Sequence, residues 1–165
     1  MSNTIKVGVI SDTHGFLNSE IFNIFKDVDH ILHAGDIGTE DILDELRKIA
    51  PVTAVQGNGD YFSGWEKYRQ VEILHFNGKK LLLTHEADRP PRQQQPMQEL
   101  ISAHAPHAVI YGHSHFSSIT EEEGILYINP GCGGRDSYSN DASVVILNIG
   151  DKLKAEVLLL DKGKF

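Results

Sequence analysis

One stretch of the chain indicates both the fold and a candidate site, and it reads Ala108-Val109-Ile110-Tyr111-Gly112-His113-Ser114-His115. Its first four residues are apolar and predict a buried strand that ends at Gly112. Because residues two apart in an extended chain point the same way, His113 and His115 are expected to leave the end of this strand together. Two such imidazoles suit a metal ion. A lone His-x-His is also common in polar loops, so the other strand ends must decide.

Four other predicted strands end in polar side chains of similar chemistry. They cover residues 5–10, 31–34, 52–55 and 79–84, and they are followed by Ser11-Asp12-Thr13-His14, Gly35-Asp36, Gly57-Asn58-Gly59-Asp60 and His85. In an open sheet with parallel crossovers, ligands collect beyond the carboxyl ends of the strands, so these side chains are expected to meet. Any one of them could instead cap a helix or complete a turn, but that explanation would have to hold at every strand end. The candidate site residues are therefore Asp12, His14, Asp36, Asn58, His85, His113 and His115.

The rest of the pattern predicts a single α/β domain that spans residues 1–165. Apolar residues at helical spacing predict one helix that begins at Asn18 or Ser19, and a second over residues 40–49 with Thr39 as its cap. Asn77-Gly78 predicts a tight hairpin between the strands at 71–76 and 79–84. A polar loop at 89–96, a helix at 97–104 and hairpins around 121–124 and 150–151 complete the predicted elements. We find no internal repeat, linker or domain boundary.

Composition excludes several classes of protein. A net charge of -8 argues against a chain that coats nucleic acid or an anionic membrane, because both need clustered Lys and Arg. Cys132 is the one cysteine, so no internal disulfide can form and a reducing compartment is indicated. The N-terminus lacks the apolar core of a signal peptide, and no apolar run approaches the ~18 residues of a membrane helix. These features together predict a cytoplasmic protein.

The candidate site residues offer a mixed set of oxygen and nitrogen donors. Two carboxylates, four imidazoles and one carboxamide, without a thiolate, suit Mn, Fe, Ni, Co or Zn rather than Ca or a cysteine-bound structural zinc. Seven protein ligands are too many for one ion that also holds water, whereas two ions that share one carboxylate fit the number. Two ions roughly 3.5–4 Å apart can share a hydroxide and hold a phosphoryl group, which is the arrangement of metal-assisted hydrolysis.

The five blocks, in this order, resemble the metallophosphoesterase (calcineurin-like phosphoesterase) superfamily, and especially its small bacterial and archaeal phosphodiesterases. The blocks are Asp12-x-His14, Gly35-Asp36, Gly57-Asn58-x-Asp60, His85 and Gly112-His113-x-His115, followed by Ile128-Asn129-Pro130-Gly131. The resemblance runs from residue 7 to about residue 131. It implies a four-layer αββα sandwich with two mixed β-sheets. It also implies hydrolysis of a phosphoric ester by a metal-bridging hydroxide at a dinuclear site.

The resemblance also implies a role for each candidate residue. One ion would be held by Asp12, His14, Asp36 and His115, and the other by Asp36, Asn58, His85 and His113. Asp36 would bridge the two ions, and Asn58, His14 and Asp36 would take part in catalysis. Two divalent ions, Mn²⁺ in first place with Ni²⁺, Fe²⁺, Co²⁺ or Zn²⁺ as alternatives, are the expected cofactors.

Four residues in three segments depart from the superfamily's pattern. Gly59 lies where larger relatives have a histidine that is thought to assist the leaving group, and Thr39 lies where they often have Arg or Asp. Glu86-Ala87 follow His85, where Gly-His is common. Small phosphodiesterases of the superfamily share the loss at Gly59, which implies that hydrolysis depends strongly on a good leaving group.

The expected substrate is a small phosphate ester, most simply a diester, with no stable nucleic-acid or membrane partner. The sequence leaves a homo-oligomer open. It also leaves open a non-catalytic metal-binding scaffold that resembles the retromer subunit of eukaryotic sorting machinery, and a phosphomonoesterase or protein phosphatase of the same fold. Arg89 and Arg92 either reach a substrate phosphate or lie in a solvated loop. His33 either supports the ligands or packs locally.

Overall fold

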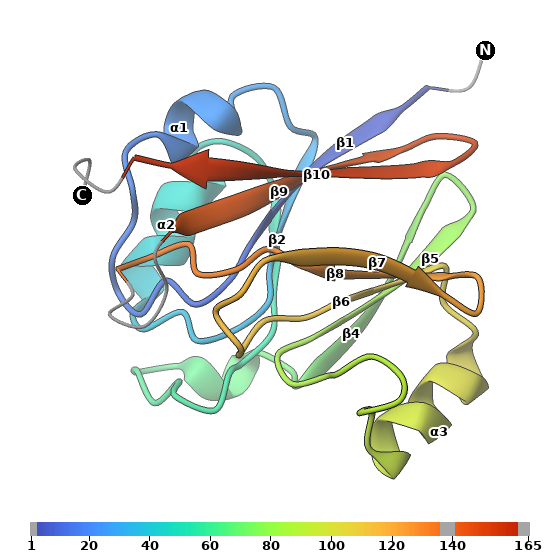
Figure 1. Cartoon of the computed structure of the whole chain (residues 1–165). Helices are drawn as coiled ribbons and strands as arrows, with labels where there is room; N and C mark the ends of the chain where they lie inside the picture. The colour runs from blue at the N-terminus through green and yellow to red at the C-terminus, as the bar shows by residue number, and fades with distance from the viewer. Residues whose placement is uncertain (1–2, 136–140, 162–165) are drawn as a thin grey trace.

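Two five-stranded mixed β-sheets pack face to face to form the centre of the protein (Figure 1). The computed structural model describes residues 3–135 and 141–161. The first sheet has the order β10-β9-β1-β2-β3 and the second has the order β4-β5-β6-β8-β7. The strands are β1 (Ile5–Ile10), β2 (His30–His33), β3 (Val52–Ala54), β4 (Val71–Phe76), β5 (Lys79–Thr84), β6 (Ala108–Ile110), β7 (Ser118–Glu122), β8 (Ile125–Asn129), β9 (Ala142–Ile149) and β10 (Leu153–Leu160). The helices are α1 (Ile21–Ile24), α2 (Glu40–Arg47) and α3 (Gln95–His104), with a short 3₁₀ helix, η1 (Trp65–Lys67).

Successive apolar residues of a strand point to opposite faces of its sheet. In the first sheet, one face packs against the second sheet and the other against the helices outside. Val7 and Val9 of β1 point into the space between the sheets, where Leu81 and Leu83 of β5 also lie. Ile10, at the end of β1, belongs instead to the cluster on the outer side of the first sheet. Burial of this kind stabilises by roughly 25 cal/mol per Å² of apolar surface removed from water, so the alternation fixes which face each strand presents.

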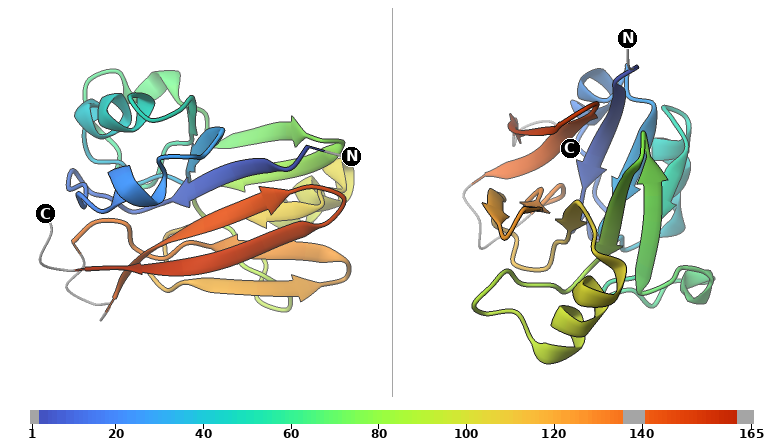
Figure 2. Two further views of the ribbon diagram at one scale, coloured as in Figure 1. Left: turned by 90° about the horizontal axis from the view of Figure 1, so that it is seen from above. Right: turned by 90° about the vertical axis from the view of Figure 1, so that its right-hand side faces the viewer.

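Helices cover both outer faces of the pair of sheets. Leu43 and Leu46 of α2 pack in the outer cluster of the first sheet, and Ile101 of α3 packs against Leu82 and Val109 on the second. Figure 2 shows the sheets as adjacent layers, with the blue and teal helices on one side and the yellow helix on the other. The α/β architecture with two mixed sheets is thus confirmed, and the order of layers is the predicted αββα.

Parallel pairing brings the carboxyl ends of several strands to one edge of the molecule. β1 pairs with β2 and β2 with β3, all parallel, and β5 pairs parallel with β6 in the second sheet. Backbone hydrogen bonds also join neighbouring loops within each sheet at this edge, since the N–H of Gly112, beyond β6, donates to the carbonyl of His85, beyond β5. The N–H of Asp12, beyond β1, donates to the carbonyl of Gly35, beyond β2, at 3.0 Å. The loops that carry the candidate site residues are therefore tied to one another.

The helices differ most from prediction. The helix expected from Asn18 or Ser19 is a single turn at Ile21–Ile24, with Glu20 as its N-cap residue. The Asn18 side chain accepts a hydrogen bond from the Glu20 N–H and donates one to the Asp161 carbonyl, so it forms a turn that precedes the helix. α2 begins after Thr39 as predicted but ends at Arg47, and the Thr39 side chain makes no capping hydrogen bond.

Two other helical segments also differ from the prediction. α3 begins at Gln95, two residues earlier than expected, because Pro96 is well suited to the first turn of a helix. The sequence did not predict η1, since a three-residue helix carries no periodic signal. The hairpins at 71–84 and 118–129 and the pairing of β9 with β10 agree with the sequence.

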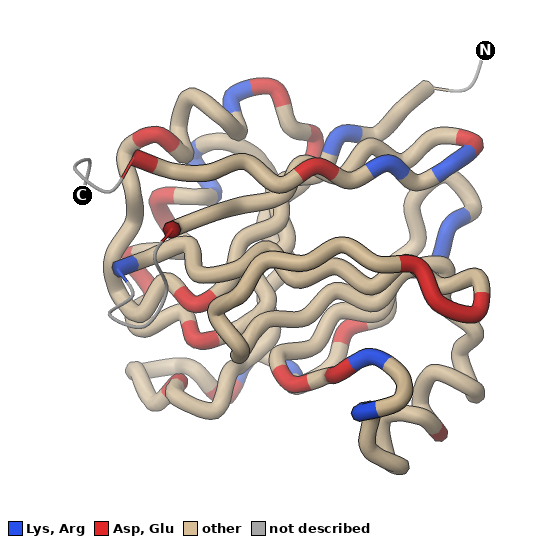
Figure 3. The backbone as a smooth tube through the Cα atoms, viewed as in Figure 1, with Lys and Arg blue, Asp and Glu red and all other residues tan. Residues whose placement is uncertain are grey.

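Charged residues are spread over the surface rather than segregated by element. Figure 3 shows Lys and Arg interspersed with Asp and Glu along the chain, and an acidic turn between β7 and β8. The acidic residues are Glu121 and Glu122 at the end of β7 and Glu123 in the turn itself. Among the described residues, no helix is long and apolar enough to cross a membrane.

Candidate metal centre

All seven candidate residues lie beyond the carboxyl ends of strands from both sheets. Asp12 and His14 follow β1, Asp36 follows β2 and Asn58 follows β3. His85 follows β5 directly, and His113 and His115 follow β6. Asp12, Asp36 and His85 are buried, whereas His14, Asn58 and His113 are exposed. The cluster therefore has a buried acidic floor and a side that is open to solvent.

One half of the cluster contains Asp12, His14 and His115. His115 Nε2 lies 3.2 Å from Asp12 Oδ1, and His14 Nε2 lies 3.8 Å from the same oxygen. The two imidazoles face each other, with 3.4 Å between their Nε2 atoms. One ligand atom from each residue lies within 4.8 Å of the others, a spacing that one metal ion can span.

Asp36 lies between this half and the other. Its Oδ2 atom is 3.7 Å from His14 Nε2 on one side and 3.3 Å from His85 Nε2 on the other. This is the place that a bridging carboxylate would occupy. Asp12 Oδ1 is also within 4.0 Å of His85 Nε2, so both carboxylates are near both halves.

Asn58 and His113 complete the second half. The Asn58 Oδ1 atom lies 2.9 Å from His85 Nε2 and 3.2 Å from His113 Nδ1. The structure thus brings together every residue that the sequence selected. Their role as metal ligands remains a prediction.

The backbone conformation is unusual at five of these seven residues. Positive φ angles occur at Asp12 (56°), His14 (47°), Asp36 (54°), His113 (72°) and His115 (66°). Side chains disfavour this region, and each such residue costs of order 1–3 kcal/mol. The other non-glycine residues with positive φ among those described are Asn77, Ala105 and Glu123, which lie in turns or at a helix end. Strain concentrated in one cluster indicates a functional site.

The Asp12 carboxylate supplies one test of whether a cation fits. Its Oδ2 atom accepts hydrogen bonds from the Ser11 hydroxyl at 2.6 Å and from the His113 N–H at 3.1 Å. Its Oδ1 atom is buried and has no hydrogen-bond partner. A buried, unpaired carboxylate oxygen is costly, and this one faces three imidazole nitrogens. A cation at this point would satisfy it.

His85 supplies a second test. Its Nδ1–H donates to the Ala34 carbonyl at 2.7 Å, which leaves a lone pair on Nε2 in the neutral ring. Nε2 then faces Asn58 Oδ1, another acceptor, at 2.9 Å. Two acceptors at this distance repel unless a proton or a metal ion lies between them. Metal-binding histidines usually donate a hydrogen bond from the ring nitrogen that does not bind the metal, and the bond from His85 Nδ1–H to the Ala34 carbonyl is of this kind.

The pKa values of the central groups agree with a site that attracts positive charge. Burial alone would raise the pKa of Asp36, but a hydrogen bond to His85, the His85 charge and the Gly59 N–H lower it to about 2. Burial would lower the pKa of His85, yet Asp36 and Asp12 raise it above its ordinary value. The Asp36 carboxylate is thus held ionised, and its negative charge favours a cation in the site.

Two glycines permit the close approach of these loops. A Cβ atom at Gly57 would lie 2.2 Å from Asp36 Oδ1, and one at Gly112 would lie 2.0 Å from Ser11 Oγ. Gly59 is less restricted, because its Cβ would lie 3.2 Å from Asp36 Oδ1, and its N–H donates to that oxygen at 2.7 Å. At this position the chain supplies a hydrogen bond from the backbone in place of a side chain.

The loops are braced by residues that sequence reasoning did not assign. Asp60 is buried, and its carboxylate accepts hydrogen bonds from Ile37 N–H, Gly38 N–H and Gly57 N–H at 2.8–3.0 Å. It therefore fastens the loop after β3 to the loop after β2. Asp60 stands in the Gly57-Asn58-x-Asp60 block, which was the available signal. The buried Cys132 thiol donates to the Asp12 carbonyl at 3.3 Å.

His33 supports the ligand loops. Its Nε2–H donates to Thr13 Oγ1 at 2.9 Å, and its Nδ1 accepts the Gly35 N–H at 3.2 Å. The Thr13 hydroxyl donates in turn to the Ile37 carbonyl. Burial lowers the pKa of His33 to about 3, so the ring is neutral and fixed as the Nε2–H tautomer. Of the two interpretations that the sequence left open, support of the site loops is the one that these contacts favour.

The polar loop contains one ion pair outside the cluster. Arg89 pairs with Glu122 of β7 at 3.2 Å. Arg92 is exposed. Neither arginine belongs to the group of residues that gathers around Asp12 and Asp36, so neither is assigned to the site.

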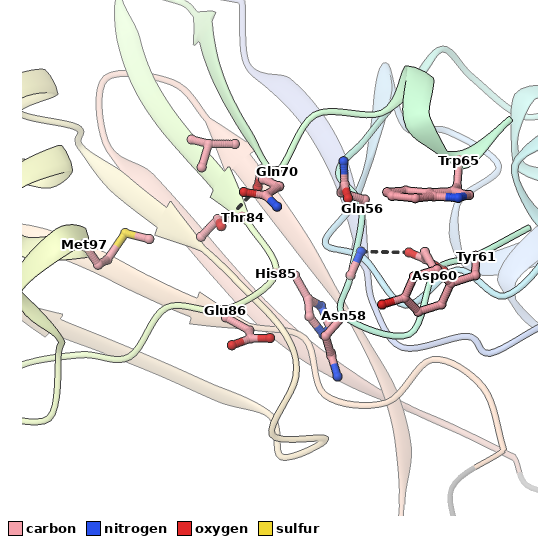
Figure 4. Close-up of a pocket in the computed structure, with 12 residues that line it drawn as sticks. Gln56, Asn58, Asp60, Tyr61, Trp65, Gln70, Thr84, His85, Glu86 and Met97 are labelled. Carbon is pink, nitrogen blue, oxygen red and sulfur yellow. Dashed lines mark hydrogen bonds between the residues drawn. The ribbon is translucent and has the colours of Figure 1, made fainter.

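A cleft of about 470 Å³ adjoins the cluster on the side of Asn58 and His85. Its walls come from the segment between β3 and β4, from the end of β5 and from α3 (Figure 4). The lining residues are Gln56, Gly57, Asn58, Asp60, Tyr61, Trp65, Gln70, Val71, Thr84, His85, Glu86 and Met97. Sequence reasoning missed this cleft, because most of its walls come from irregular chain without a motif.

Comparison with known proteins identifies relatives that are named phosphoesterases. Residues 5–152 match the calcineurin-like phosphoesterase superfamily domain. Over 158 residues, the chain is 37% identical to a probable metallophosphoesterase of Methanothermobacter thermautotrophicus, covering 92% of this chain and 91% of that protein. It is 30% identical to a phosphodiesterase of Methanocaldococcus jannaschii, covering 78% and 86% of the two chains. The solved structure of Vps29 from Chaetomium thermophilum is similar with a TM-score of 0.80 and 15% identity, covering 97% and 92%, a likeness of fold alone.

Proposed function

Because the chain belongs to the calcineurin-like phosphoesterase superfamily, we propose that it is a metal-dependent phosphodiesterase. The observation that carries the proposal is the meeting of all seven donors around an unpaired Asp12 oxygen and an opposed pair of acceptors, His85 Nε2 and Asn58 Oδ1. The relative from Methanocaldococcus that is named a phosphodiesterase supports the diester as the substrate class. The proposed substrate is a small phosphoric diester.

Two divalent ions, with Mn²⁺ in first place, are the proposed cofactors. One would be held by Asp12, His14, Asp36 and His115, and the other by Asp36, Asn58, His85 and His113. Such ions would activate a water molecule and hold the phosphoryl oxygens. The mixture of carboxylate, imidazole and amide donors supports Mn²⁺, and Ni²⁺, Fe²⁺, Co²⁺ and Zn²⁺ are the alternatives.

The chain's own residues prepare the substrate for attack. Asp36, whose pKa is lowered to about 2, is negatively charged at neutral pH and would therefore be available to hold a metal ion. Asn58 directs Oδ1 toward the two histidines, which leaves its amide NH₂ directed away from them. From there it can donate to a phosphoryl oxygen as negative charge develops.

The leaving group receives no proton from position 59. In diester hydrolysis the water oxygen forms a new bond to phosphorus, the bond to one ester oxygen breaks, and that oxygen departs as an alcohol or its anion. Gly59 offers only a backbone N–H, and it donates to Asp36. Rates should therefore fall steeply as the pKa of the leaving alcohol rises, which a comparison of nitrophenyl with alkyl diesters measures.

Substitution of the central ligands tests the proposal. Asp36→Asn and His113→Ala are expected to reduce metal-dependent diester cleavage at least about 100-fold, as loss of a charge-stabilising group at a reacting centre commonly does. His75→Ala is the matched control, because His75 is exposed on β4, in a strand that supplies none of the seven residues. Full activity in either ligand variant would rule out the proposed site.

A further inference from the structure

The cleft adjoins the candidate metal centre and offers space for a substituent of a phosphate ester bound there. It includes Asn58 and His85, two members of the cluster, and it extends from them between η1 and α3. A phosphoryl group at the cluster would therefore place one of its ester substituents in this space. The volume of about 470 Å³ is ample for a substituent larger than a short alkyl chain.

Two aromatic side chains and a methionine form part of the walls of the cleft. Tyr61 and Trp65 meet edge to face, with ring centroids 5.5 Å apart and an interplanar angle of 69°. Tyr61 is 77% exposed, so much of its surface is free for contact. Figure 4 shows both rings on one side of the cleft and Met97 on the other. Exposed aromatic rings of this kind favour stacking with planar groups.

The polar groups in the cleft suit an uncharged ring that forms hydrogen bonds. Gln56 donates through Nε2 to the Tyr68 carbonyl at 2.7 Å, which leaves its Oε1 atom as an acceptor, and Gln70 is exposed at the rim. Asp60 and Glu86 are the acidic lining residues, and none of the twelve is Lys or Arg. Away from the proposed metal ions, no lining side chain would balance the charge of a second phosphate on the leaving group.

We infer that this cleft is the leaving-group subsite and that it takes a planar, uncharged, hydrogen-bonding ring, as the base of a nucleoside provides. The substrate class would then be diesters in which one alcohol is a nucleoside. The assignment of the cleft to the leaving group rests on the proposed hydrolysis, whereas the inferred affinity of the cleft for a planar ring does not. The two are therefore measured separately.

Binding is measured through Trp65, the one tryptophan of the chain. Adenosine 5′-monophosphate and ribose 5-phosphate differ only by the base, and each is titrated into the protein with and without Mn²⁺ while tryptophan fluorescence is recorded. N-acetyltryptophanamide corrects for absorption by the base. The monophosphate with the base is expected to bind at least about fivefold more tightly, the effect of stacking one base.

Two exposed aromatic residues provide the test variant and its control. Tyr61→Ala is expected to remove most of the advantage of the base and to raise KM more than it lowers kcat for bis(p-nitrophenyl) phosphate, whose leaving group is also a planar ring. Phe22→Ala removes an exposed ring from α1, outside the cleft, and is expected to leave both quantities unchanged.

The outcomes separate this inference from the proposed function. Equal binding of the two phosphates, or tighter binding of phosphocholine than of adenosine monophosphate, would overturn the ring subsite even if diesters are cleaved. A clear preference for the base without turnover of any ester would support the subsite as a binding site and reject hydrolysis.

Discussion

At the scale of single residues, the candidate site combines strain with unsatisfied charge. Five of the seven residues adopt positive φ, and the Asp12 Oδ1 atom has no hydrogen-bond partner. A protein that only needed to fold would gain stability by relaxing both features. Their coincidence at one point is the strongest physical reason to expect a cation there.

The positions of these residues were predictable from the sequence, but their conformations were not. Placement at strand ends follows from apolar runs that stop at a polar residue, as at His85. The positive φ of Asp12 and His14 depends on contacts with loops more than twenty residues away, such as the bond from Asp12 N–H to the Gly35 carbonyl. Local patterns carry no information on such contacts.

His33 should make the stability of the fold depend on pH. Its pKa is about 3 in the folded protein, below the 6.5 of an ordinary histidine, so the unfolded chain binds a proton that the folded chain does not. The contribution of the neutral ring is complete above about pH 6.5 and decreases as the pH falls from there toward 3, by up to about 1.4 kcal/mol per pH unit.

Urea unfolding in the presence of a chelator, at pH 7.0, 5.5 and 4.5, measures this dependence. His33→Gln keeps a donor for Thr13 but does not titrate, so its free energy of unfolding should fall less steeply with pH than that of the parent. His75→Gln, on the exposed side of β4, should retain the parent slope. Identical slopes in all three proteins would show that His33 is not buried as a neutral ring.

At the scale of elements, short helices and irregular loops position the site more than long helices do. α1 is a single turn where a longer helix was predicted. The Asn18 side chain forms a turn by accepting a hydrogen bond from the Glu20 N–H, and it donates another to the Asp161 carbonyl, so the helix does not begin at Asn18. The spacing of apolar residues in the sequence correctly predicts the burial of Ile21 and Phe25, but it does not reveal the hydrogen bonds that shorten the helix. η1 escaped prediction because it is too short to have a period.

The segment that contains η1 is fastened to α2 by a polar network. Glu40 Oε1 accepts hydrogen bonds from the Tyr68 hydroxyl at 2.7 Å, from Arg47 at 3.0 Å and from Lys67 at 3.0 Å. Burial would raise the pKa of Glu40, but these donors lower it below its ordinary value. The network therefore holds Trp65, and with it one wall of the cleft.

Glu40→Gln should weaken this attachment. The loss of the charge is expected to reduce the free energy of unfolding by about 1 kcal/mol and to speed amide exchange around Trp65. Glu45→Gln is the control, since Glu45 pairs with Lys48 on the exposed side of α2 and takes no part in the Glu40 network. Equal stability and equal exchange in the two variants would mean that the network does not hold the segment.

At the scale of the whole molecule, the sequence predicted the architecture well. The resemblance of five ordered blocks to a known superfamily implied two mixed sheets with helices outside, and the predicted order of strands was compatible with that fold. The structure confirms the two sheets, and the match to the family model confirms the superfamily. What the sequence could not predict is the cleft, because Gln56, Trp65 and Met97 come together only through the packing of η1 and α3 beside the second sheet.

The fold alone does not decide between an enzyme and a scaffold. The same architecture occurs in Vps29, and a likeness of fold does not carry an activity with it. The seven donors gathered near an unpaired carboxylate oxygen support metal binding, which an enzyme and a metal-binding scaffold would share. Turnover is therefore the property to measure.

The most direct measurement is hydrolysis of bis(p-nitrophenyl) phosphate by metal-stripped protein as Mn²⁺, Ni²⁺, Mg²⁺ and Zn²⁺ are added back, with p-nitrophenyl phosphate in parallel. We expect cleavage of the diester to be absent without metal, to be restored by Mn²⁺ and to exceed cleavage of the monoester. Two ions bound per chain, shown by calorimetry, with no cleavage of either ester under any metal would contradict the account and identify the protein as a metal-binding scaffold.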